Sequence, residues 1–207
     1  MAEIAAILNA GFEVRHGGRV VLIDPLLTPS DSMPVPPRFH APQIAAADLI
    51  LITHSHWDHF DADGIVAVAH RTGAVIAGPA AVAKRLQGRL PEKQRLELEP
   101  AEGRRPPECV ATTVGGIGVT AFRTYHSRGH NSCLVEMPGG PGEASLRIFD
   151  DGDNEDTRPL DVAALGAIDV LLLGGPWQGS AWVEFIERLC PRRWLLMHLT
   201  LEELDAH

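Results

Sequence analysis

The chain is poor in cysteine and in aromatic residues. Its three cysteines, Cys109, Cys133 and Cys190, lie far apart and form no Cys-x-x-Cys pair. This spacing argues against a disulfide framework or a cysteine zinc knuckle, and it suits a reducing cytosol. Aromatic residues make up 5% of the chain and hydrophobic residues 45%. We therefore expect a cytoplasmic protein whose core is built mainly from Val, Ile, Leu and Ala.

Positive charge and long apolar runs are also scarce. The chain has 18 Lys and Arg against 27 Asp and Glu, a formal net charge of -9, which argues against a nucleic-acid partner. An anionic substrate stays possible, because bound divalent metals can dominate the local field. No stretch is long enough to span a membrane, and residues 1–11 lack the basic start of a signal peptide. We predict one domain, residues 1–207, with a small-molecule substrate and no membrane or nucleic-acid partner; the oligomeric state cannot be read from the sequence.

Short aliphatic runs alternate with segments of helical periodicity. The stripe Trp182, Phe185, Ile186 and Leu189 is typical of an amphipathic helix. One further helix is predicted over 64–71, with Asp61 or Asp63 as its cap and Gly73 at its end, and another over 80–86. Strands are predicted at 20–23, 47–53, 74–77, 119–125, 134–137, 146–149 and 194–197. This alternation indicates a layered α/β domain with helices outside the sheets.

The two halves of the chain resemble each other. A strand followed by Asp occurs at 20–25 and again at 146–153, and Ala-Asp-Leu-Ile-Leu-Ile-Thr-His at 47–54 resembles Ala-Ile-Asp-Val-Leu-Leu-Leu-Gly at 167–174. The similarity suggests one domain built from two similar halves.

The segment His54–His59, which reads His-Ser-His-Trp-Asp-His, directly follows a predicted buried strand. Imidazole and carboxylate side chains crowded together are costly to bury without partners, and they are good ligands for zinc, iron or manganese. His54 and His56, two apart on an extended loop, can reach one metal, while Asp58 and His59 turn toward a second.

Three more residues of ligand type follow predicted strands: His126, Asp153 and His198. Each alone has an ordinary explanation, since Asp153 lies in an acidic run typical of a solvated turn and His198 is near the C-terminus. Together with the first cluster they provide enough ligands for two metals that share one carboxylate.

This order of ligands resembles the metallo-β-lactamase superfamily: His-x-His-x-Asp-His after a strand, then a His, an Asp after a Gly, and a final His. The similarity covers nearly the whole chain, with Leu-Ile-Asp-Pro at 22–25 as the entry strand and 148–153 as the strand that carries the bridging Asp. It implies an α/β fold, the four-layer αββα sandwich of two similar halves. Within the superfamily, the chain resembles the small metal-dependent hydrolases related to L-ascorbate 6-phosphate lactonase and N-acylphosphatidylethanolamine phospholipase D.

The resemblance also implies roles for single residues. Asp24 would orient a ligating histidine by a hydrogen bond. Metal 1 would be held by His54, His56 and His126, and metal 2 by Asp58, His59 and His198, with Asp153 bridging the two.

The sequence departs from the family pattern at two places and is ambiguous at a third. Asn9-Ala10-Gly11 stands where relatives have a Gly-His pair, and Asn154 stands where they often have Thr. His126 and His130 lie four apart and either could be the ligand. We favour His126, because it ends the strand; His130 would then face the substrate or lie on the surface.

The implied chemistry is hydrolysis. Two divalent ions, with zinc favoured and manganese or iron as alternatives, would lower the pKa of a bridging water to give a hydroxide nucleophile and stabilise the resulting oxyanion. We expect cleavage of an ester-like bond in a lactone, phosphodiester or thioester, with Asp58 orienting the nucleophile and His130 as general acid. The loop 28–42 and the loop at Trp177 are expected to line the pocket.

Two other functions fit parts of the pattern. A diiron redox enzyme of the same fold would resemble His-x-Glu-x-Asp, whereas this chain has His56 where that Glu would stand. A non-catalytic scaffold protein is the second alternative, and an intact ligand set argues against it.

Overall fold

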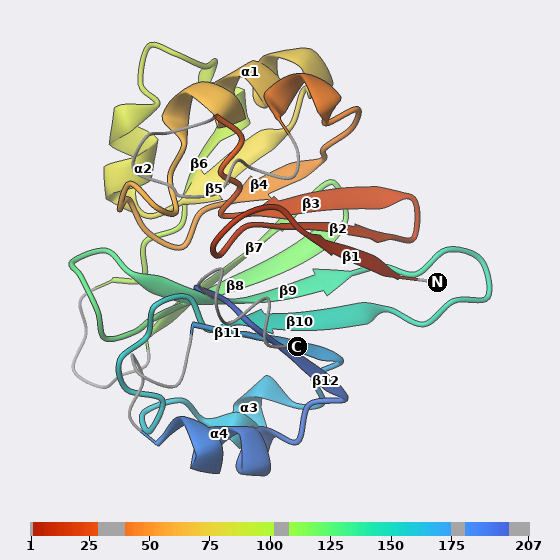
Figure 1. The fold of residues 1–207 in the computed structure, drawn as a ribbon, viewed down its shortest axis with the longest axis vertical. Coiled ribbons are helices and arrows are strands. Elements are labelled where there is room, and N and C mark those ends of the chain that lie inside the picture. The colour runs from red at the N-terminus through yellow and green to blue at the C-terminus, as the bar shows by residue number, and fades with distance from the viewer. Residues whose placement is uncertain (1, 29–39, 102–107, 175–180, 199–207) are drawn as a thin grey trace.

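Two six-stranded sheets face each other, and helices cover the outer face of each (Figure 1). The computed structural model describes residues 2–28, 40–101, 108–174 and 181–198. The strands of the first sheet, in spatial order, are β1 (Glu3–Ala6), β2 (Phe12–His16), β3 (Arg19–Ile23), β4 (Leu49–Leu51), β5 (Val75–Gly78) and β6 (Arg95–Glu97). Its outer face carries α1 (Ala62–Thr72) and α2 (Ala80–Arg85), with short 3-10 turns at Ala41–Gln43 and Glu92–Gln94.

The second sheet also has six strands, and each strand pairs with the next one along the chain. Its strands are, in chain order, β7 (Cys109–Val114), β8 (Ile117–Arg123), β9 (Asn131–Met137), β10 (Leu146–Asp150), β11 (Val170–Leu173) and β12 (Arg193–Leu196). Its outer face carries α3 (Val162–Leu165) and α4 (Trp182–Leu189). The predicted αββα sandwich is confirmed.

Each sheet combines antiparallel and parallel strands. In the first sheet β1, β2 and β3 are antiparallel and β3 to β6 are parallel. In the second, β7 to β10 are antiparallel and β10 to β12 are parallel. The two sequence segments that resemble each other are therefore equivalent: β3 and β10 begin the parallel part of their sheets, and β4 and β11 follow them. The carboxyl ends of parallel strands share one edge, where α/β proteins bind ligands.

The core has three layers because the central strands are buried on both faces. On β3, Val21 and Ile23 pack between the two sheets, whereas Val20 and Leu22 pack toward the first pair of helices. Strands of this kind read as continuous aliphatic runs rather than as alternating patterns. The third layer, beneath the second sheet, is where Phe149 packs with Phe185 of α4.

Helix α1 shows how the sequence sets its limits. The Asp61 side chain accepts a hydrogen bond from the backbone N–H of Gly64 at 2.9 Å, so Asp61 is the cap and Asp63 is not. Gly73, at φ 79°, ends the helix in the left-handed conformation that glycine adopts without strain. Asp61 also accepts from the backbone N–H groups of Leu27 and Thr28, at 2.8 and 2.7 Å, which ties the helix start to the chain that leaves β3.

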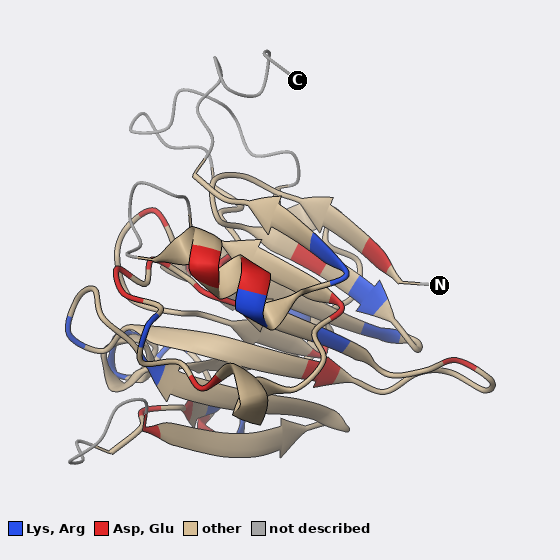
Figure 2. Ribbon diagram, turned by 90° about the horizontal axis from the view of Figure 1, so that it is seen from below, with Lys and Arg blue, Asp and Glu red and all other residues tan. Residues whose placement is uncertain are grey.

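Among the elements that the sequence did not predict are β1, β2, β7 and the short α3. Strand β1 is exposed at both ends and β7 alternates between exposed and half-buried residues, so neither has the aliphatic run that marks a central strand. Among the described helices, none is both long and apolar enough to cross a membrane. Charged residues of both signs are interspersed over loops, strand ends and α4 in the view of Figure 2.

Candidate metal centre

Seven predicted ligands come together where strands of both sheets end. The loop after β4 carries the cluster at 54–59, β10 leads to Asp153, β12 leads to His198, and β8 is followed by His126. Their ligand atoms fall into two groups, and within each group all atoms lie within 4.8 Å of one another: His54, His56 and His126 in one, and Asp58, His59, Asp153 and His198 in the other. Residues separated by up to 144 positions thus share one site because parallel strands end at the same edge.

In the first group the facing atoms are spaced as ligands of one ion would be. His126 Nε2 lies 3.2 Å from His56 Nδ1, and the rings of His54 and His56 meet edge to face at 4.5 Å. Two nitrogens at 2.0–2.1 Å from a tetrahedral metal lie about 3.3 Å apart. The observed separation therefore fits a shared metal without rearrangement.

The second group is centred on the Asp153 carboxylate. Asp153 Oδ1 lies 2.7 Å from His198 Nε2 and 3.2 Å from His59 Nε2. Asp58 is the outermost member, with Oδ2 3.9 Å from His59 Nε2. The group has two imidazoles and two carboxylates, a donor set that suits zinc, iron and manganese.

Asp153 also reaches the first group with its other oxygen. Asp153 Oδ2 lies 3.6 Å from His126 Nε2 and 3.8 Å from His54 Nε2. One carboxylate therefore presents one oxygen to each group. This is the geometry that a bridging ligand between two metals requires.

A hydrogen-bonded chain behind the site fixes two imidazole rings. Asp24 Oδ2 accepts from His59 Nδ1 at 2.7 Å and from the Thr53 hydroxyl at 2.5 Å, while Asp24 Oδ1 accepts from the Thr53 backbone N–H at 2.8 Å. The Thr53 hydroxyl in turn lies 3.0 Å from His54 Nδ1. Because the proton on His59 Nδ1 is held by Asp24, its Nε2 lone pair is free for a metal. Asp24, His54 and His59 also lie within 4.8 Å of one another, but Asp24 binds the Nδ1 side of His59, opposite the Nε2 that faces Asp153, so we assign Asp24 the role of orienting a ligand.

Two buried nitrogens support a metal site independently of the distances. The Nε2 atoms of His54 and His59 are buried and have no hydrogen-bond partner among the described residues. Buried polar atoms without partners are rare in folded proteins, and these two point into the two ligand groups. A divalent ion in each group would satisfy them, so the residues present fit the metals that the sequence implies.

The charges of the site are strongly coupled. Burial, with the neighbouring His59 and His130, holds the pKa of His54 well below its ordinary value. Burial also opposes a charge on His59, but the Asp24 and Asp153 carboxylates outweigh it and raise the pKa of His59 to about 10. Burial likewise disfavours the Asp153 carboxylate, yet the hydrogen bond from His198 and the positive charge of the neighbouring His59 hold its pKa well below the usual range. Without metal, the site is therefore held together by imidazole–carboxylate pairs.

His130 is placed differently from either expectation. It is buried, with 1% of its surface exposed, and its Nε2 accepts a hydrogen bond from the Asp153 backbone N–H at 2.9 Å. Its Nδ1 pairs with the Thr124 hydroxyl at 2.9 Å, and burial lowers the pKa of His130 to about 3. The expectation that His130 faces the substrate or the surface is wrong, and as a general acid it would have no proton aimed at a substrate. Of the two candidates, His126 is the one that lies among the other ligands.

Two positioning contacts had no signal in the sequence. Glu155 Oε1 lies 2.9 Å from His126 Nδ1, and nothing in its local sequence distinguishes it from a solvated acidic residue. Asn9, at φ 56°, donates from Nδ2 to the Asp58 carbonyl at 3.0 Å and accepts from the His198 backbone N–H at 3.4 Å. The sequence marked Asn9 only as a departure from a family pattern.

Two further sequence expectations concern Asn154 and the substrate pocket. Asn154 accepts from the Tyr125 backbone N–H at 3.2 Å and donates to Asp151 Oδ1 at 3.1 Å, so it joins the loops that carry His126 and Asp153. The pocket predicted from the loop 28–42 and from Trp177 falls mostly on residues 29–39 and 175–180, outside the described residues.

A family model described as a beta-lactamase superfamily domain matches residues 19–199. The chain belongs to this superfamily. The match runs from β3 to the residue after His198 and so includes all seven candidate ligands. The resemblance inferred from the ligand order is confirmed, while the relation to the lactonase and phospholipase branches stays a prediction.

Relatives within and around this superfamily agree with the fold. A UPF0173 metal-dependent hydrolase of Thermococcus onnurineus is 28% identical over 215 residues, which cover 96% of this chain and 84% of the relative. The structure of a metallo hydrolase from Ignicoccus hospitalis matches with a TM-score of 0.67 at 20% identity, over 96% of this chain and 83% of that one. CmlA, a diiron beta-hydroxylase from Streptomyces venezuelae, matches with a TM-score of 0.64 at 17% identity, over 97% of this chain and 45% of CmlA. Both structures are similar to this chain in fold.

Proposed function

We propose that this protein is a dinuclear metal-dependent hydrolase that cleaves an ester-like bond in a small molecule. The observation that carries the proposal is the Asp153 carboxylate, which presents one oxygen to each of two separate ligand groups. The coarser statement, metal-dependent hydrolysis, matches the description of the curated relatives. The dinuclear mechanism and the bond class are our extension of it.

The metals and the residues have separate tasks in this mechanism. Two divalent ions, when bound, would supply an activated water at neutral pH and Lewis-acid polarisation of the bond to be cleaved. Asp58 is the outermost carboxylate of the second group. One of its two oxygens would bind a metal, and the other would contact the attacking water. We assign it the orientation of the attacking water, since its carboxylate can accept a hydrogen bond from that water. Zinc is favoured by the nitrogen-rich first group, with manganese or iron as alternatives.

The surroundings of the site favour a substrate with an apolar part. Trp57, next to His56, is 61% exposed, and Tyr125, next to His126, is 51% exposed. Among the described residues, they are two of five large hydrophobic side chains that are exposed. Aromatic side chains exposed beside a polar site commonly contact ligands, so we propose that they flank the non-reacting part of the substrate.

The setting proposed for this activity is the cytoplasm, without nucleic-acid or membrane partners. Cys109 and Cys190 are exposed free thiols, as expected in a reducing compartment. The net charge of -9 supports a small-molecule substrate over a nucleic acid.

The diiron hydroxylase match supports no second function, because it extends to the fold alone. His56 occupies the position where the redox pattern would have Glu. Iron nevertheless belongs in the metal test, since the donor set accepts it.

The decisive experiment combines metal analysis with a substrate panel. The protein would be stripped with chelator, reloaded separately with zinc, manganese or iron(II), and its metal content measured. Each form would then be assayed with a phosphodiester, a phosphomonoester, a lactone, a thioester and a β-lactam. We expect two ions per chain and turnover of one bond class.

Asp153→Ala and Asp156→Ala form the matched pair of variants. Asp156 lies three residues on, binds Arg158 and takes no part in the ligand groups. Turnover lost in Asp153→Ala and kept in Asp156→Ala would support the proposal. Failure to bind more than one ion per chain would refute the dinuclear mechanism, and two bound ions with no hydrolysis of any ester-like bond would refute the bond class.

A further inference from the structure

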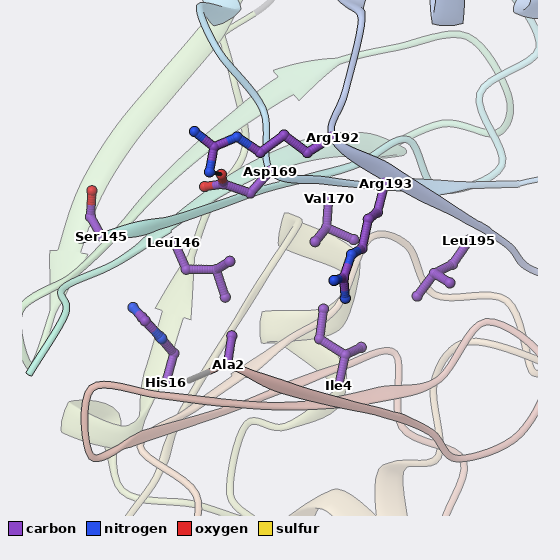
Figure 3. Close-up of a pocket in the computed structure, with 10 residues that line it drawn as sticks. All are labelled: Ala2, Ile4, His16, Ser145, Leu146, Asp169, Val170, Arg192, Arg193 and Leu195. Atoms are coloured by element: carbon purple, nitrogen blue, oxygen red, sulfur yellow. Dashed lines mark ion pairs between the residues drawn. The ribbon is translucent and has the colours of Figure 1, made fainter. Parts of the chain in front are cut away.

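A cavity lies at the end of the sheets away from the metal centre. It has a volume of about 440 Å³ and opens between β1 and β2 of one sheet and the amino ends of β10, β11 and β12 of the other (Figure 3). The metal ligands follow the carboxyl ends of β4, β10 and β12. The two sites are therefore separated by the length of the strands that they share, and the cavity takes no part in the proposed hydrolysis.

Half of the ten residues that line this cavity are aliphatic. Ile4 contributes from the first sheet, and Leu146, Val170 and Leu195 from the second. Their side chains point into the same space in Figure 3. A volume of this size falls in the range of about 300–1,000 Å³ that is usual for small-molecule sites, so an apolar ligand body would fit.

His16 places an unpaired acceptor on one side of the cavity. The side chain is 8% exposed, and its Nε2 lies 2.9 Å from the Ala144 carbonyl oxygen. Because a carbonyl only accepts, the Nε2 carries the proton, and the neutral ring has a lone pair on Nδ1. That Nδ1 is buried and has no hydrogen-bond partner among the described residues. A hydroxyl or N–H group of a ligand would satisfy it.

Arg193 places an unpaired positive charge on the other side. Its neighbour Arg192 is bound by Asp169 at 3.1 Å, and Arg147 and Arg19 are bound by Glu136 and Asp48. Arg193 has no carboxylate within 4.0 Å in the part of the chain that the structure describes, although it lines the cavity. With one of its two arginines neutralised by Asp169, the cavity keeps a net positive charge.

We propose that this cavity binds a small organic monoanion whose aliphatic body also carries a hydroxyl group. The carboxylate binds the Arg193 guanidinium, which suits it geometrically, the aliphatic body contacts Ile4, Val170 and Leu195, and the hydroxyl donates to His16 Nδ1. Hydroxylated fatty acids of medium chain length have this chemistry.

The test uses three probes of equal chain length on the metal-loaded protein: 8-hydroxyoctanoate, octanoate and octan-1-ol. Affinities would be measured by calorimetry and the site located by NMR shifts of Ile4, Val170 and Leu195. We expect 8-hydroxyoctanoate to bind tightest, octanoate about 2- to 10-fold more weakly for one lost hydrogen bond, and octan-1-ol weakest. Arg193→Gln should weaken both carboxylates about tenfold and leave octan-1-ol unchanged.

Two controls separate this site from the metal centre. Arg188→Gln changes an exposed arginine on α4 outside the cavity and should leave all three affinities unchanged. Asp153→Ala, with the metals removed, should still bind 8-hydroxyoctanoate. Loss of binding in that variant would mean that the carboxylate binds at the metal centre, and equal affinity of the three probes would mean that neither Arg193 nor His16 recognises a ligand; either result overturns the proposal.

Discussion

The two ligand groups of the metal centre are supported in different ways. In the second group, buried His59 is held by Asp24, which is 1% exposed, and the backbones of Asp58 and His198 are joined through Asn9. In the first group, His54 is connected to Asp24 only through the Thr53 hydroxyl, and His126 is held by Glu155, whose side chain is 57% exposed. Buried hydrogen bonds and ion pairs are weakened less by competing water and by side-chain motion than exposed ones are.

This difference predicts two metal sites of unequal affinity. The second group is preorganised by a dry network and should bind its ion first, whereas the first group depends on a partner that water can replace. Stepwise titration of the metal-free protein should therefore show two binding events rather than one. The variants below would break or sharpen that contrast.

Asp153→Ala should have the largest effect, because it removes the one carboxylate that both groups share. Changes to outer partners alone commonly cost 10–100-fold, so we expect turnover to fall by more than about 100-fold and the affinity of both ions to decrease. Metal content after dialysis and turnover of the best substrate measure this. If only one ion were lost and the other kept its full affinity, Asp153 would not bridge.

Asp24→Asn should weaken the second group more than the first, because Asp24 binds His59 directly and reaches His54 only through Thr53. The amide keeps the size of the carboxylate and tolerates the φ of 39° at this position, but it holds the His59 and Thr53 protons less strongly. We expect about 10- to 100-fold weaker binding of the tighter ion, measured by competition with a chelator. An equal loss at both ions would show that the network supports the two groups alike.

Glu155→Gln should weaken the first group, and by less. Because Glu155 is exposed, its bond to His126 already competes with water, and we expect about a tenfold loss at most. Chelator competition on the weaker ion is the measurement, and the tighter ion serves as the internal control. A loss as large as that of Asp24→Asn would contradict the contrast between buried and exposed support.

Asn9→Gly should have the smallest effect. Glycine keeps the positive φ and the carbonyl that accepts from His198, so only the bond from Nδ2 to the Asp58 carbonyl is lost. We expect the free energy of unfolding to fall by about 1 kcal/mol, with a modest loss in turnover. Urea denaturation of the metal-free protein measures the first part, and unchanged stability would show that this bond contributes nothing.

The sequence predicted the interior of the fold better than its edges. Central strands such as β3 and β10 were found because both of their faces are buried, which leaves an uninterrupted aliphatic run. The edge strands β1 and β7 were missed, because a strand with exposed faces has no such run. Helix α1 was predicted with its end at Gly73, since a cap and a glycine are local signals that need no tertiary contact.

The kind of chemistry was readable from the sequence as well. Four ligand-type residues within His54–His59, with single ligands after three further strands, specify a metal centre because such residues are costly to bury without an ion. Their order along the chain was enough to indicate the superfamily, which the family model confirms.

Only the tertiary structure decided what each histidine does. His126 and His130 both lie in the loop between β8 and β9, and no local signal in the sequence distinguishes them. The fold turns His126 toward His56 and buries His130 against the Asp153 backbone. The sequence did not reveal the contacts of Glu155 and Asn9 or the cavity at Arg193, and the reason is the same. Each is formed by chain segments that are distant in sequence and become adjacent only after the sheets have packed.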